Sequence, residues 1–594
     1  MAQAAVEKKK STWRALGLAL RNRKTGFMLL FGFAAGLPYA LLLGTLYAWL
    51  TEAEVDLETM GVFSLIGLSY AFKFLWSPAL DRIDIAGLRR LGKRKQWLVP
   101  AQVLLGAILL ALSFFDPGSQ LGWFSLLAGI GAFASATQDV VIDAWRVDVA
   151  DDVATIDILS TVYQMGYRIA ALIGGALALI LAERIGWPSV YLLMGAILLA
   201  VGFFGLFAPD ADAQALKALE AEAGDDPHGL REAGEILPKV RAWALAAVGL
   251  LWGWALATVI IFMVRSLSST PEARPDSVAF IQTMGPLIVV ATVVVPALIA
   301  ALLVKLRNEG RHTIPTQVDD GPGVQTAHYQ SQYAAGGSGG RFLDHLYRAL
   351  VLPLVEFVGR MGWALVLVLA LVLTYRITDA IWGTFAYPFY LGELEYTLDE
   401  VAVASKFFGV GAVVAGLALG GFLLTAIGRM PTLLLGALLA ALTNLLYADL
   451  AVGGARMQAA SDFIGFTWAV TQFPGGSERL ARLMITIFAE NLAVGIAGAA
   501  FVAWLSSIVA KGYSAVQYAL LSSLTMLVGT LGRGALGQMI EERGYYYVFI
   551  LTTLIGLVAV VLVMIEWWRE KRGKAQAGVI APEAGEVASA GQPR

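Results

Sequence analysis

The sequence predicts an all-α polytopic membrane protein of fourteen transmembrane helices, built as two six-helix bundles with an inserted helix pair. Three observations support this fold class. The 594 residues are 58% hydrophobic and only 15% charged, whereas soluble proteins have about 25% charged residues. Fourteen apolar runs are long enough to cross the hydrocarbon core of a bilayer. Two short motifs recur at equivalent places in the two halves of the chain.

The distribution of positive charge predicts that both termini lie in the cytoplasm. With the N-terminus inside, the cytoplasmic segments contain most of the 43 Lys and Arg residues. The dense clusters Lys8–Lys24, Arg82–Lys95 and Arg569–Lys574 then all lie inside, as the positive-inside rule requires. The basic N-terminus lacks the short apolar core and the cleavage site of a secretory signal, so the first span is expected to direct insertion.

Two sequence repeats divide the chain into halves. Leu50–Met60 (LTEAEVDLETM) matches Leu391–Val401 (LGELEYTLDEV) without a gap, and each stretch follows the first span of a half. Ala182–Leu193 likewise resembles Glu541–Leu551, between the fifth and sixth spans. Parallel repeats of six spans are typical of two-bundle secondary transporters. Chance similarity between acidic loops is the alternative explanation.

The predicted organisation has seven parts. They are a basic cytoplasmic N-terminus (1–25), an N-terminal six-helix bundle (26–208), a cytoplasmic linker (209–239), two extra transmembrane helices (240–304), a flexible cytoplasmic linker (305–361), a C-terminal six-helix bundle (362–567) and a cytoplasmic tail (568–594). Within the second bundle, segment 452–481 is expected to form either a surface amphipathic helix or a short re-entrant piece.

The residue types inside the predicted spans exclude several kinds of chemistry. The chain has no cysteine, so disulfides, thiolate nucleophiles and cysteine metal sites are excluded. Its four histidines all fall in the two cytoplasmic linkers, so proton coupling would have to use a carboxylate. We therefore expect no metal, no cofactor and no enzymatic activity. The net charge of −2 gives no indication of a nucleic-acid partner.

The stretch SATQDVVIDAWRVD places charge inside the fourth span, where an unpaired charge costs at least roughly 2.5–3.5 kcal/mol. Asp139 and Asp143 are spaced i, i+4 and share one helix face. Asp139 is a candidate for proton coupling and for substrate binding, and Gln138 offers a donor and an acceptor to a sugar or amide. Asp143 with Arg146 or Arg168 is a candidate gating or structural pair. A salt-bridged helix pair without a ligand is the alternative for both carboxylates.

The second dense polar site is TYRITDAIWG, in the first span of the second half. Arg376 and Asp379 are spaced i, i+3 and can pair along one face. Tyr375 and Trp382 add aromatic faces on which sugar rings stack, so all four residues are substrate-binding candidates. Asp379 is also a candidate for proton coupling. A self-neutralised pair without a ligand is the alternative.

A further carboxylate lies in the twelfth span, in the stretch FAENLAVG. Glu490 is a candidate for accepting a proton from the outside, and Asn491 is a candidate for binding substrate. A structural ion pair between Glu490 and Lys406 is equally plausible.

The loop SPALDRIDIAGLRRLGKRKQW, after the second span, resembles the signature loop of the major facilitator superfamily. In that family an acid and basic residues at this turn brace the two halves in one state of alternating access. The resemblance implies this gating role for Asp81 and Arg82, with Arg89 and Arg90 as further carriers. The loop here has a longer insertion before its basic run.

The stretches GFAAGLPYALLLGTLYAWL, YAFKFLWSPALDR and SATQDVVIDAWRVD resemble the AmpG family of this superfamily. The resemblance implies proton-driven import of N-acetylglucosaminyl-1,6-anhydro-N-acetylmuramyl peptides across the bacterial inner membrane. It further implies a role in peptidoglycan recycling and, in some bacteria, in β-lactamase induction. Tyr39 and Lys73 lie in these stretches and are additional substrate-binding candidates. The expected partners are the disaccharide-peptide, protons and the lipid bilayer, with the protein acting as a monomer.

Two other transporter functions remain as alternatives. A carrier of the acetyl-CoA type would need a cationic site for phosphates, whereas the basic residues inside the spans are few and scattered. Another transporter of the superfamily, such as a drug exporter, would share the fold and differ in its cargo.

Overall fold

The computed structural model describes residues 17–55, 67–210, 236–269, 273, 275, 277–313, 337–376, 385–386 and 388–580, and within these ranges the regular structure is entirely helical. The described residues form two compact units. The first unit comprises residues within Met1–Gly362 together with Val502–Ala535. The second comprises Trp363–Phe501 together with Leu536–Arg594. A segment from the C-terminal half of the chain, Val502–Ala535, therefore belongs to the first unit.

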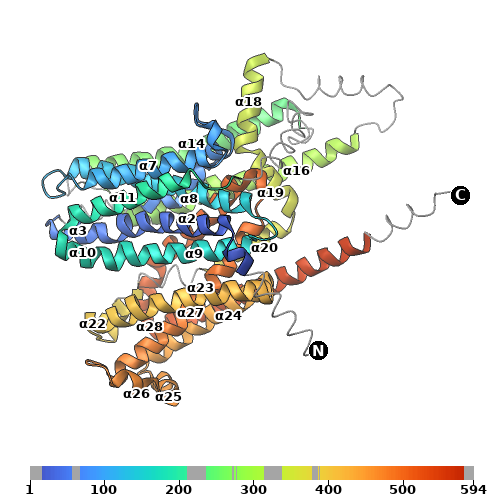
Figure 1. The fold of residues 1–594 in the computed structure, drawn as a ribbon. Helices are drawn as coiled ribbons and strands as arrows, with labels where there is room; N and C mark the ends of the chain where they lie inside the picture. Colours follow the sequence, from blue (N-terminus) through green and yellow to red (C-terminus); the bar gives the residue numbers. More distant parts are fainter. Residues whose placement is uncertain are drawn as a thin grey trace. The chain divides into compact units, whose positions relative to one another are not determined.

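The first unit is a bundle of long helices, of which α2, α7, α9 and α11 run side by side (Figure 1). Its elements in chain order are α2 (Arg23–Ala40), η1 (Leu41–Thr45), α3 (Leu46–Glu52), α5 (Leu68–Ala71), η3 (Lys73–Leu75), α6 (Ser77–Arg82), η4 (Arg89–Leu91), α7 (Lys95–Leu112), α8 (Leu121–Val149), α9 (Ile156–Leu172), η5 (Ile173–Leu177), α10 (Ala178–Ile185), α11 (Trp187–Gly205), α14 (Pro238–Ser268), α15 (Ser277–Val289), η7 (Val290–Val294), α16 (Val295–Thr313), α18 (Gly337–Leu350), α19 (Leu352–Met361) and η10 (Lys511–Tyr513).

Helices α2 and α9 approach each other closely because small residues lie at their crossing. A Cβ atom on Gly32 would lie 2.2 Å from the carbonyl oxygen of Tyr163, and one on Gly166 would lie 2.3 Å from that of Leu29. Membrane helices use small residues in this way, since lipid supplies no hydrophobic driving force between them. The close packing fixes the position of α9 beside α2 and α8.

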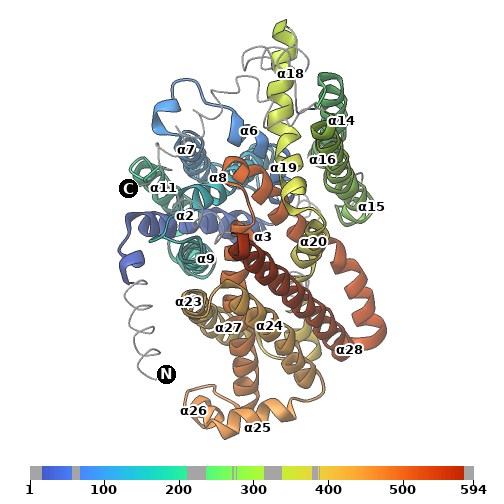
Figure 2. The same cartoon turned by 90° about the vertical axis from the view of Figure 1, so that its right-hand side faces the viewer.

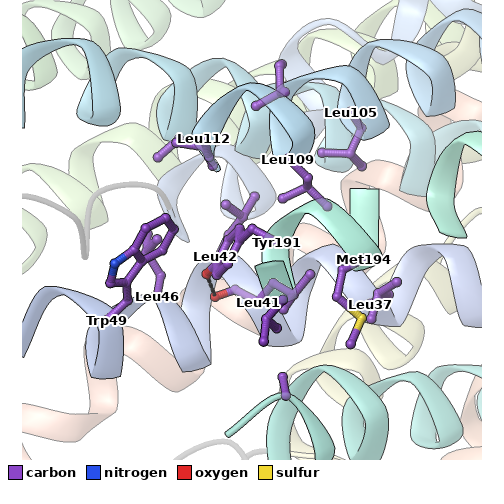
Figure 3. Close-up of a cluster of buried hydrophobic side chains, with 14 of the residues drawn as sticks. Leu37, Leu41, Leu42, Leu46, Trp49, Leu105, Leu109, Leu112, Tyr191 and Met194 are labelled. Atoms are coloured by element: carbon purple, nitrogen blue, oxygen red, sulfur yellow. Dashed lines mark hydrogen bonds between the residues drawn. The ribbon is translucent and has the colours of Figure 1, made fainter. Parts of the chain in front are cut away.

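The core of the first unit is a layer of apolar side chains between α2, α7 and α11 (Figure 3). The hydroxyl of Tyr191 donates to the carbonyl of Leu41 at 3.3 Å, where the helix widens into the π-helical segment η1. Trp49 packs edge-on against Phe124. The other side chains labelled in the figure are Leu37, Leu42, Leu46, Leu105, Leu109, Leu112 and Met194.

The second unit contains the long helices α23, α24 and α27, with two short helices beyond one end of them (Figure 2). Its elements are α20 (Ala364–Thr374), η8 (Pro388–Glu393), α22 (Leu398–Ala402), η9 (Val403–Gly409), α23 (Val410–Ala426), α24 (Arg429–Ala451), α25 (Ala455–Phe463), α26 (Phe466–Thr471), α27 (Glu478–Ser507) and α28 (Ser514–Ile580). The last residues of α27 and the first part of α28 belong to the first unit.

The backbone repeats where the sequence repeats. Glu54 and Glu395, which are aligned in the first repeat, both adopt positive φ angles of 57° and 52°, a conformation rare for residues other than glycine. Gly186 and Gly544, in the second repeat, both have φ of 79°. Gly544 is also the break within α28. Matching backbone conformations at matching positions argue against chance similarity.

Eleven helices within the described residues are long and apolar enough to cross a membrane, or twelve if the bent pair α19 and α20 forms one span. The prediction of fourteen spans remains open, because three expected spans run into residues whose backbone or side chains lie outside the described part. These are 60–80, 362–391 and 515–540. The fold class is all-helical, as predicted.

The prediction that residues 305–361 form a flexible linker is wrong where the structure describes them. Helix α16 continues to Thr313, and α18 and α19 occupy 337–361. Leu352 and Val355 of α19 are fully buried, and Arg241 of α14 pairs with Asp344 of α18 at 3.3 Å. The apolar residues of α18 and α19 lie on one face of each helix, which packs on α14 and α16.

Segment 452–481 forms α25 and α26, two short helices joined at Gly465. Met457 and Val470 face the core of the second unit. Several large apolar side chains nevertheless remain exposed, namely Phe463, Ile464, Trp468 and Phe473. The segment therefore buries one set of side chains and exposes another that includes large apolar ones, and both predicted forms of it stay predictions.

Candidate functional site

Four charged side chains meet inside the first unit, three from α8 and one from η3. The ammonium group of Lys73 lies 2.6 Å from the Oδ2 atom of Asp139 and 3.6 Å from that of Asp143. Arg146 pairs with Asp143 at 3.0 Å. The i, i+4 spacing along α8 thus brings both carboxylates to one lysine. With all four groups ionised, the two cations and two anions of this charged cluster cancel.

The members of the charged cluster differ in their access to solvent. The side chain of Asp139 is 17% exposed, whereas those of Lys73 and Asp143 are 5% exposed and that of Arg146 is fully buried. A carboxylate must be reached by water to exchange a proton rapidly. Asp139 is therefore the acid of the cluster best placed for this exchange.

Tyrosines surround the charged cluster, and sequence reasoning had not singled out most of them. The hydroxyl of Tyr163 on α9 donates to the Oδ1 atom of Asp139 at 3.0 Å. The hydroxyl of Tyr70 on α5 donates to Ser135 at 2.8 Å. Tyr39 contacts Tyr70 edge-on, with ring centroids 5.2 Å apart. The predicted candidate Tyr39 thus lies in an aromatic group beside the cluster.

Arg146 is held between aromatic rings. Its guanidinium lies 4.8 Å from the ring centroid of Tyr163 and 4.9 Å from that of Tyr518 on α28. Its Nε atom donates to Ser506 at 3.2 Å. Cation–π contacts and a buried carboxylate partner compensate the cost of burying this charge. Arg168, the other predicted partner of Asp143, is half-buried on α9, and the ion pairs of Asp143 are with Arg146 and Lys73.

Gln138 does not occupy the position expected of a ligand-binding residue. Its side chain is fully buried, and its Nε2 atom donates to the carbonyl of Ala34 on α2 at 2.7 Å. In a regular helix that carbonyl accepts from the N–H of residue 38, but residue 38 is a proline and has no N–H. The amide of Gln138 supplies the missing donor. In this conformation Gln138 therefore connects α8 to α2.

A second buried charge network lies at the end of the bundle where α6, α7 and α8 meet the start of α28. The predicted gating residue Asp81 pairs with Arg94 at 2.8 Å, and Arg94 also pairs with Asp148 at 2.7 Å. Asp148 accepts a hydrogen bond from the hydroxyl of Ser514 at 2.9 Å. The backbone N–H of Val516 donates to Asp81 at 3.1 Å. We call these residues the end network.

The structure shows a basic partner of Asp81 that the sequence analysis did not name, Arg94. Arg89 forms an exposed pair with Asp84 at 3.2 Å, and Arg90 is exposed. The side chain of Arg82 lies outside the described part. Arg94 pairs with Asp81 because the insertion in this loop shifts the basic residues along the chain. Only the fold shows that Arg94 is the arginine with a buried side chain facing Asp81.

The predicted polar site at the start of the second half is described only in part. Tyr375 is buried, donates to the carbonyl of Leu433 at 2.9 Å and stacks on Phe501 with ring centroids 5.0 Å apart. It therefore serves helix packing in the second unit. Arg376 is half-buried. Asp379 and Trp382 lie outside the described residues.

Glu490 lies at the end of a chain of hydroxyl groups in the second unit. It accepts a hydrogen bond from the hydroxyl of Tyr447, which lies 2.9 Å from the hydroxyl of Tyr390. Asn491 donates to the carbonyl of Ile487 in its own helix. The side chain of Lys406, the alternative partner of Glu490, lies outside the described part. Within the described residues, no group of three acids or histidines is arranged to bind a metal ion.

The sequence of this chain is similar to that of known membrane transporters. The sequence profile of the Major Facilitator Superfamily matches residues 25–314. The anhydromuropeptide permease of Escherichia coli (strain K12) is 27% identical over 546 residues, which cover 91% of this chain and 79% of that protein. A protein named as transporter AmpG 4 in Rickettsia conorii (strain ATCC VR-613 / Malish 7) is 25% identical over 537 residues, covering 90% of this chain and 94% of that one.

Among solved structures, the proton:xylose symporter XylE bound to 6-bromo-6-deoxy-D-glucose has the same fold. The TM-score is 0.50 at 12% identity, and the match covers 91% of this chain and 94% of that one.

The helical fold, the repeated halves and these matches define a transporter of the major facilitator superfamily. Within that superfamily the chain belongs to the AmpG family, and it is a multi-pass protein of the bacterial inner membrane. The expected family and location are thereby confirmed. Its relatives are permeases and transporters rather than enzymes.

Proposed function

We propose that this protein imports anhydromuropeptides together with protons for the recycling of cell-wall material. The cargo would be N-acetylglucosaminyl-1,6-anhydro-N-acetylmuramyl peptides. The observation that carries the proposal is the similarity to the anhydromuropeptide permease over 91% of the chain, joined to a buried carboxylate–lysine pair in the first unit. Each chain contains both repeats, so a monomer suffices for alternating access.

The proton gradient is the proposed source of energy. In the proposed symport, protons and cargo move in the same direction, from the periplasm into the cytoplasm. At roughly 150–200 mV, one proton supplies about 3.5–4.6 kcal/mol. That free energy supports a cargo gradient of about 400- to 2,000-fold at one proton per substrate.

Asp139 is the proposed proton carrier. It is more exposed than Asp143, and its Oδ1 and Oδ2 atoms accept from Tyr163 and Lys73. Asp143 is buried and has Arg146 as a partner of its own, so its proposed role is structural. Lipid-surrounded acids that are kept despite their cost are commonly part of ion or proton pathways.

The aromatic group beside Asp139 is the proposed surface for the sugar rings. Tyr39 and Tyr167 have ring centroids 5.9 Å apart, and Tyr163 and Tyr167 are 6.3 Å apart. Aromatic faces offer large apolar area, and their hydroxyl groups can bind polar substituents. This arrangement suits a disaccharide better than a purely apolar cargo.

The end network is the proposed gate of the first unit. It ties the N-terminal turn of α28 to α6 and α8 through Asp81, Arg94 and Asp148. A carboxylate at a helix N-terminus is stabilised by the free N–H groups and by the helix dipole. In the proposed cycle these contacts form in one access state and break in the other.

Uptake into proteoliposomes tests the function. Radiolabelled anhydromuropeptide should accumulate when the outside is acidic, and an ionophore that dissipates the gradient should abolish accumulation. Asp139→Asn should lose uphill uptake while remaining folded, whereas Asp84→Asn, at an exposed ion pair, should match the wild type. Accumulation of acetyl-CoA instead of muropeptide would favour the alternative carrier. Normal accumulation by Asp139→Asn would remove that residue from the proton pathway.

A further inference from the structure

Among the residues that the structure describes, Lys73 is the cation that both carboxylates of the charged cluster share. Asp143 has a second cationic partner in Arg146 at 3.0 Å, whereas the closest contact of Lys73 is with Asp139 at 2.6 Å. The four charges therefore divide into two pairs, Asp143 with Arg146 and Asp139 with Lys73. A change at Asp139 alters the charge balance of Lys73 first.

Lys73 lies outside the regular α-helices, at a point where the backbone departs from α-helical geometry. Lys73 begins η3, a short 3₁₀ segment between α5 and α6. Its neighbours Phe72 and Phe74 are buried, and its own side chain is 5% exposed. A buried ammonium group must keep an anionic partner, because an uncompensated charge in this environment is strongly unfavourable.

Protonation of Asp139 would remove the closest partner of Lys73 and leave it Asp143 at 3.6 Å, a carboxylate that Arg146 already pairs with at 3.0 Å. The carboxylate becomes a neutral acid by adding one proton, Lys73 stays protonated, and the charged cluster changes from neutral to one net positive charge. The other titratable groups around Asp139 are tyrosines, which carry no charge at physiological pH. They are Tyr39, Tyr70, Tyr163, Tyr167 and Tyr518. With Asp139 protonated, the charged cluster requires one further anion to become neutral again.

We infer that Lys73 binds a carboxylate of the cargo and exchanges it with Asp139 in each transport cycle. When Asp139 gains its proton, Lys73 turns to the cargo carboxylate. When Asp139 loses the proton on the other side, it recaptures Lys73 and the cargo is released. The inference rests on the proposed function, because the peptide part of an anhydromuropeptide carries free carboxylates. This exchange of Lys73 between Asp139 and the cargo couples the uptake of one proton to the binding of one carboxylate.

Binding measured on the purified full-length protein tests this exchange without requiring transport. The two probes are the anhydromuropeptide and the same compound with its carboxylates converted to carboxamides. For the wild type, we expect affinity for the first probe to rise as pH falls from 8 to 5.5. Affinity for the carboxamide should be lower and independent of pH.

Three variants separate the roles of the pair. Lys73→Gln should lose about tenfold or more in affinity for the carboxylate probe and should no longer distinguish the two probes. Asp139→Asn should keep the preference for the carboxylate but lose its pH dependence. Lys24→Gln is the matched control, because Lys24 forms a 2.6 Å pair with Asp151 in an exposed position, and it should behave as the wild type.

The double variant Lys73→Gln/Asp139→Asn covers the case in which Lys73→Gln fails to fold. It removes both charges of the pair and leaves Asp143 with Arg146, so the protein keeps a balanced cluster. It should bind both probes equally and without pH dependence. If either Lys73 variant retains the wild-type preference for the carboxylate, the exchange is wrong while the proposed function stands. If the wild type binds neither probe, both the proposed function and the exchange are overturned.

Discussion

Asp81 of α6 accepts a hydrogen bond from the backbone N–H of Val516 at 3.1 Å, although 435 positions separate the two residues in the chain. The same carboxylate pairs with Arg94, whose side chain is 1% exposed. Asp81 therefore satisfies both a buried arginine and the first turn of α28. One carboxylate connects parts of the chain that come from different repeats.

Removal of this carboxylate should destabilise the protein. We expect Asp81→Asn to lower the free energy of unfolding by about 3 kcal/mol, because Arg94 loses a buried partner and keeps only Asp148. Asp84→Asn breaks an exposed pair with Arg89 and should cost about 0–1 kcal/mol. Thermal unfolding of both variants in detergent measures the difference. Equal shifts would show that the end network does not stabilise this conformation.

The two carboxylates of the charged cluster should respond differently to substitution. Asp143→Asn leaves the fully buried Arg146 without its carboxylate partner, so we expect a reduced yield of folded protein. Asp139→Asn should be better tolerated, because Lys73 retains Asp143 at 3.6 Å. Size-exclusion profiles and melting temperatures of the two purified variants provide the comparison. A greater loss of folded protein for Asp139→Asn would reverse these assignments.

Glu490 provides a test of which acid carries the proton. We expect Glu490→Gln to retain uptake driven by a pH gradient, because the amide oxygen still accepts the hydrogen bond from Tyr447. Uptake into proteoliposomes at several external pH values measures this. If Glu490→Gln lost gradient-driven uptake but kept exchange of labelled for unlabelled cargo, the proton site would belong in the second unit.

The close crossing of α2 and α9 should not tolerate a side chain. We expect Gly32→Ala to destabilise the protein by about 1–3 kcal/mol, since the added Cβ would lie 2.2 Å from the carbonyl oxygen of Tyr163. Gly26→Ala is the control in the same helix, because a Cβ there meets no atom within 4 Å. The two melting temperatures should differ by several degrees, with Gly32→Ala the lower. An unchanged melting temperature for Gly32→Ala would mean that the helices can separate without cost.

The exposed apolar residues of α25 and α26 should contact the lipid surface. The chain has no native cysteine, so single cysteines at Phe463 and Trp468 can carry nitroxide labels without a background. In liposomes we expect these labels to collide more often with oxygen than with a water-soluble nickel complex. A label at the exposed Glu478 should show the opposite preference. Aqueous behaviour at all three positions would place the segment away from lipid.

Local patterns in the sequence predicted those features that depend on neighbouring residues. The pairing of Asp143 with Arg146 follows from i, i+3 spacing on one helix. The repeats predicted that Glu54 and Glu395 occupy equivalent positions, and both share the left-handed backbone conformation. The helical fold follows from the apolar runs, because only hydrogen-bonded helices satisfy the backbone of such segments in lipid.

Long-range contacts could not be read from the sequence in the same way. Lys73 was a candidate for binding substrate, but nothing local indicates that it meets Asp139, 66 positions away. Gln138 looked like a ligand group because polar residues in spans usually serve function. Its actual partner is a carbonyl freed by Pro38 on another helix. Arg94 was missed as the partner of Asp81, since several arginines share that loop, and Arg94 is the buried one among those whose side chains the structure describes.

The inclusion of Val502–Ala535 in the first unit has a consequence for biosynthesis. While the ribosome adds the residues between Gly362 and Val502, at about 5–20 residues per second, the nascent first bundle lacks Ser506, Ser514 and Tyr518. For roughly 7–28 seconds at these rates, its buried arginines must depend on partners from the first half alone. A chain that terminates early would stay in that incomplete state and become a substrate for membrane proteases.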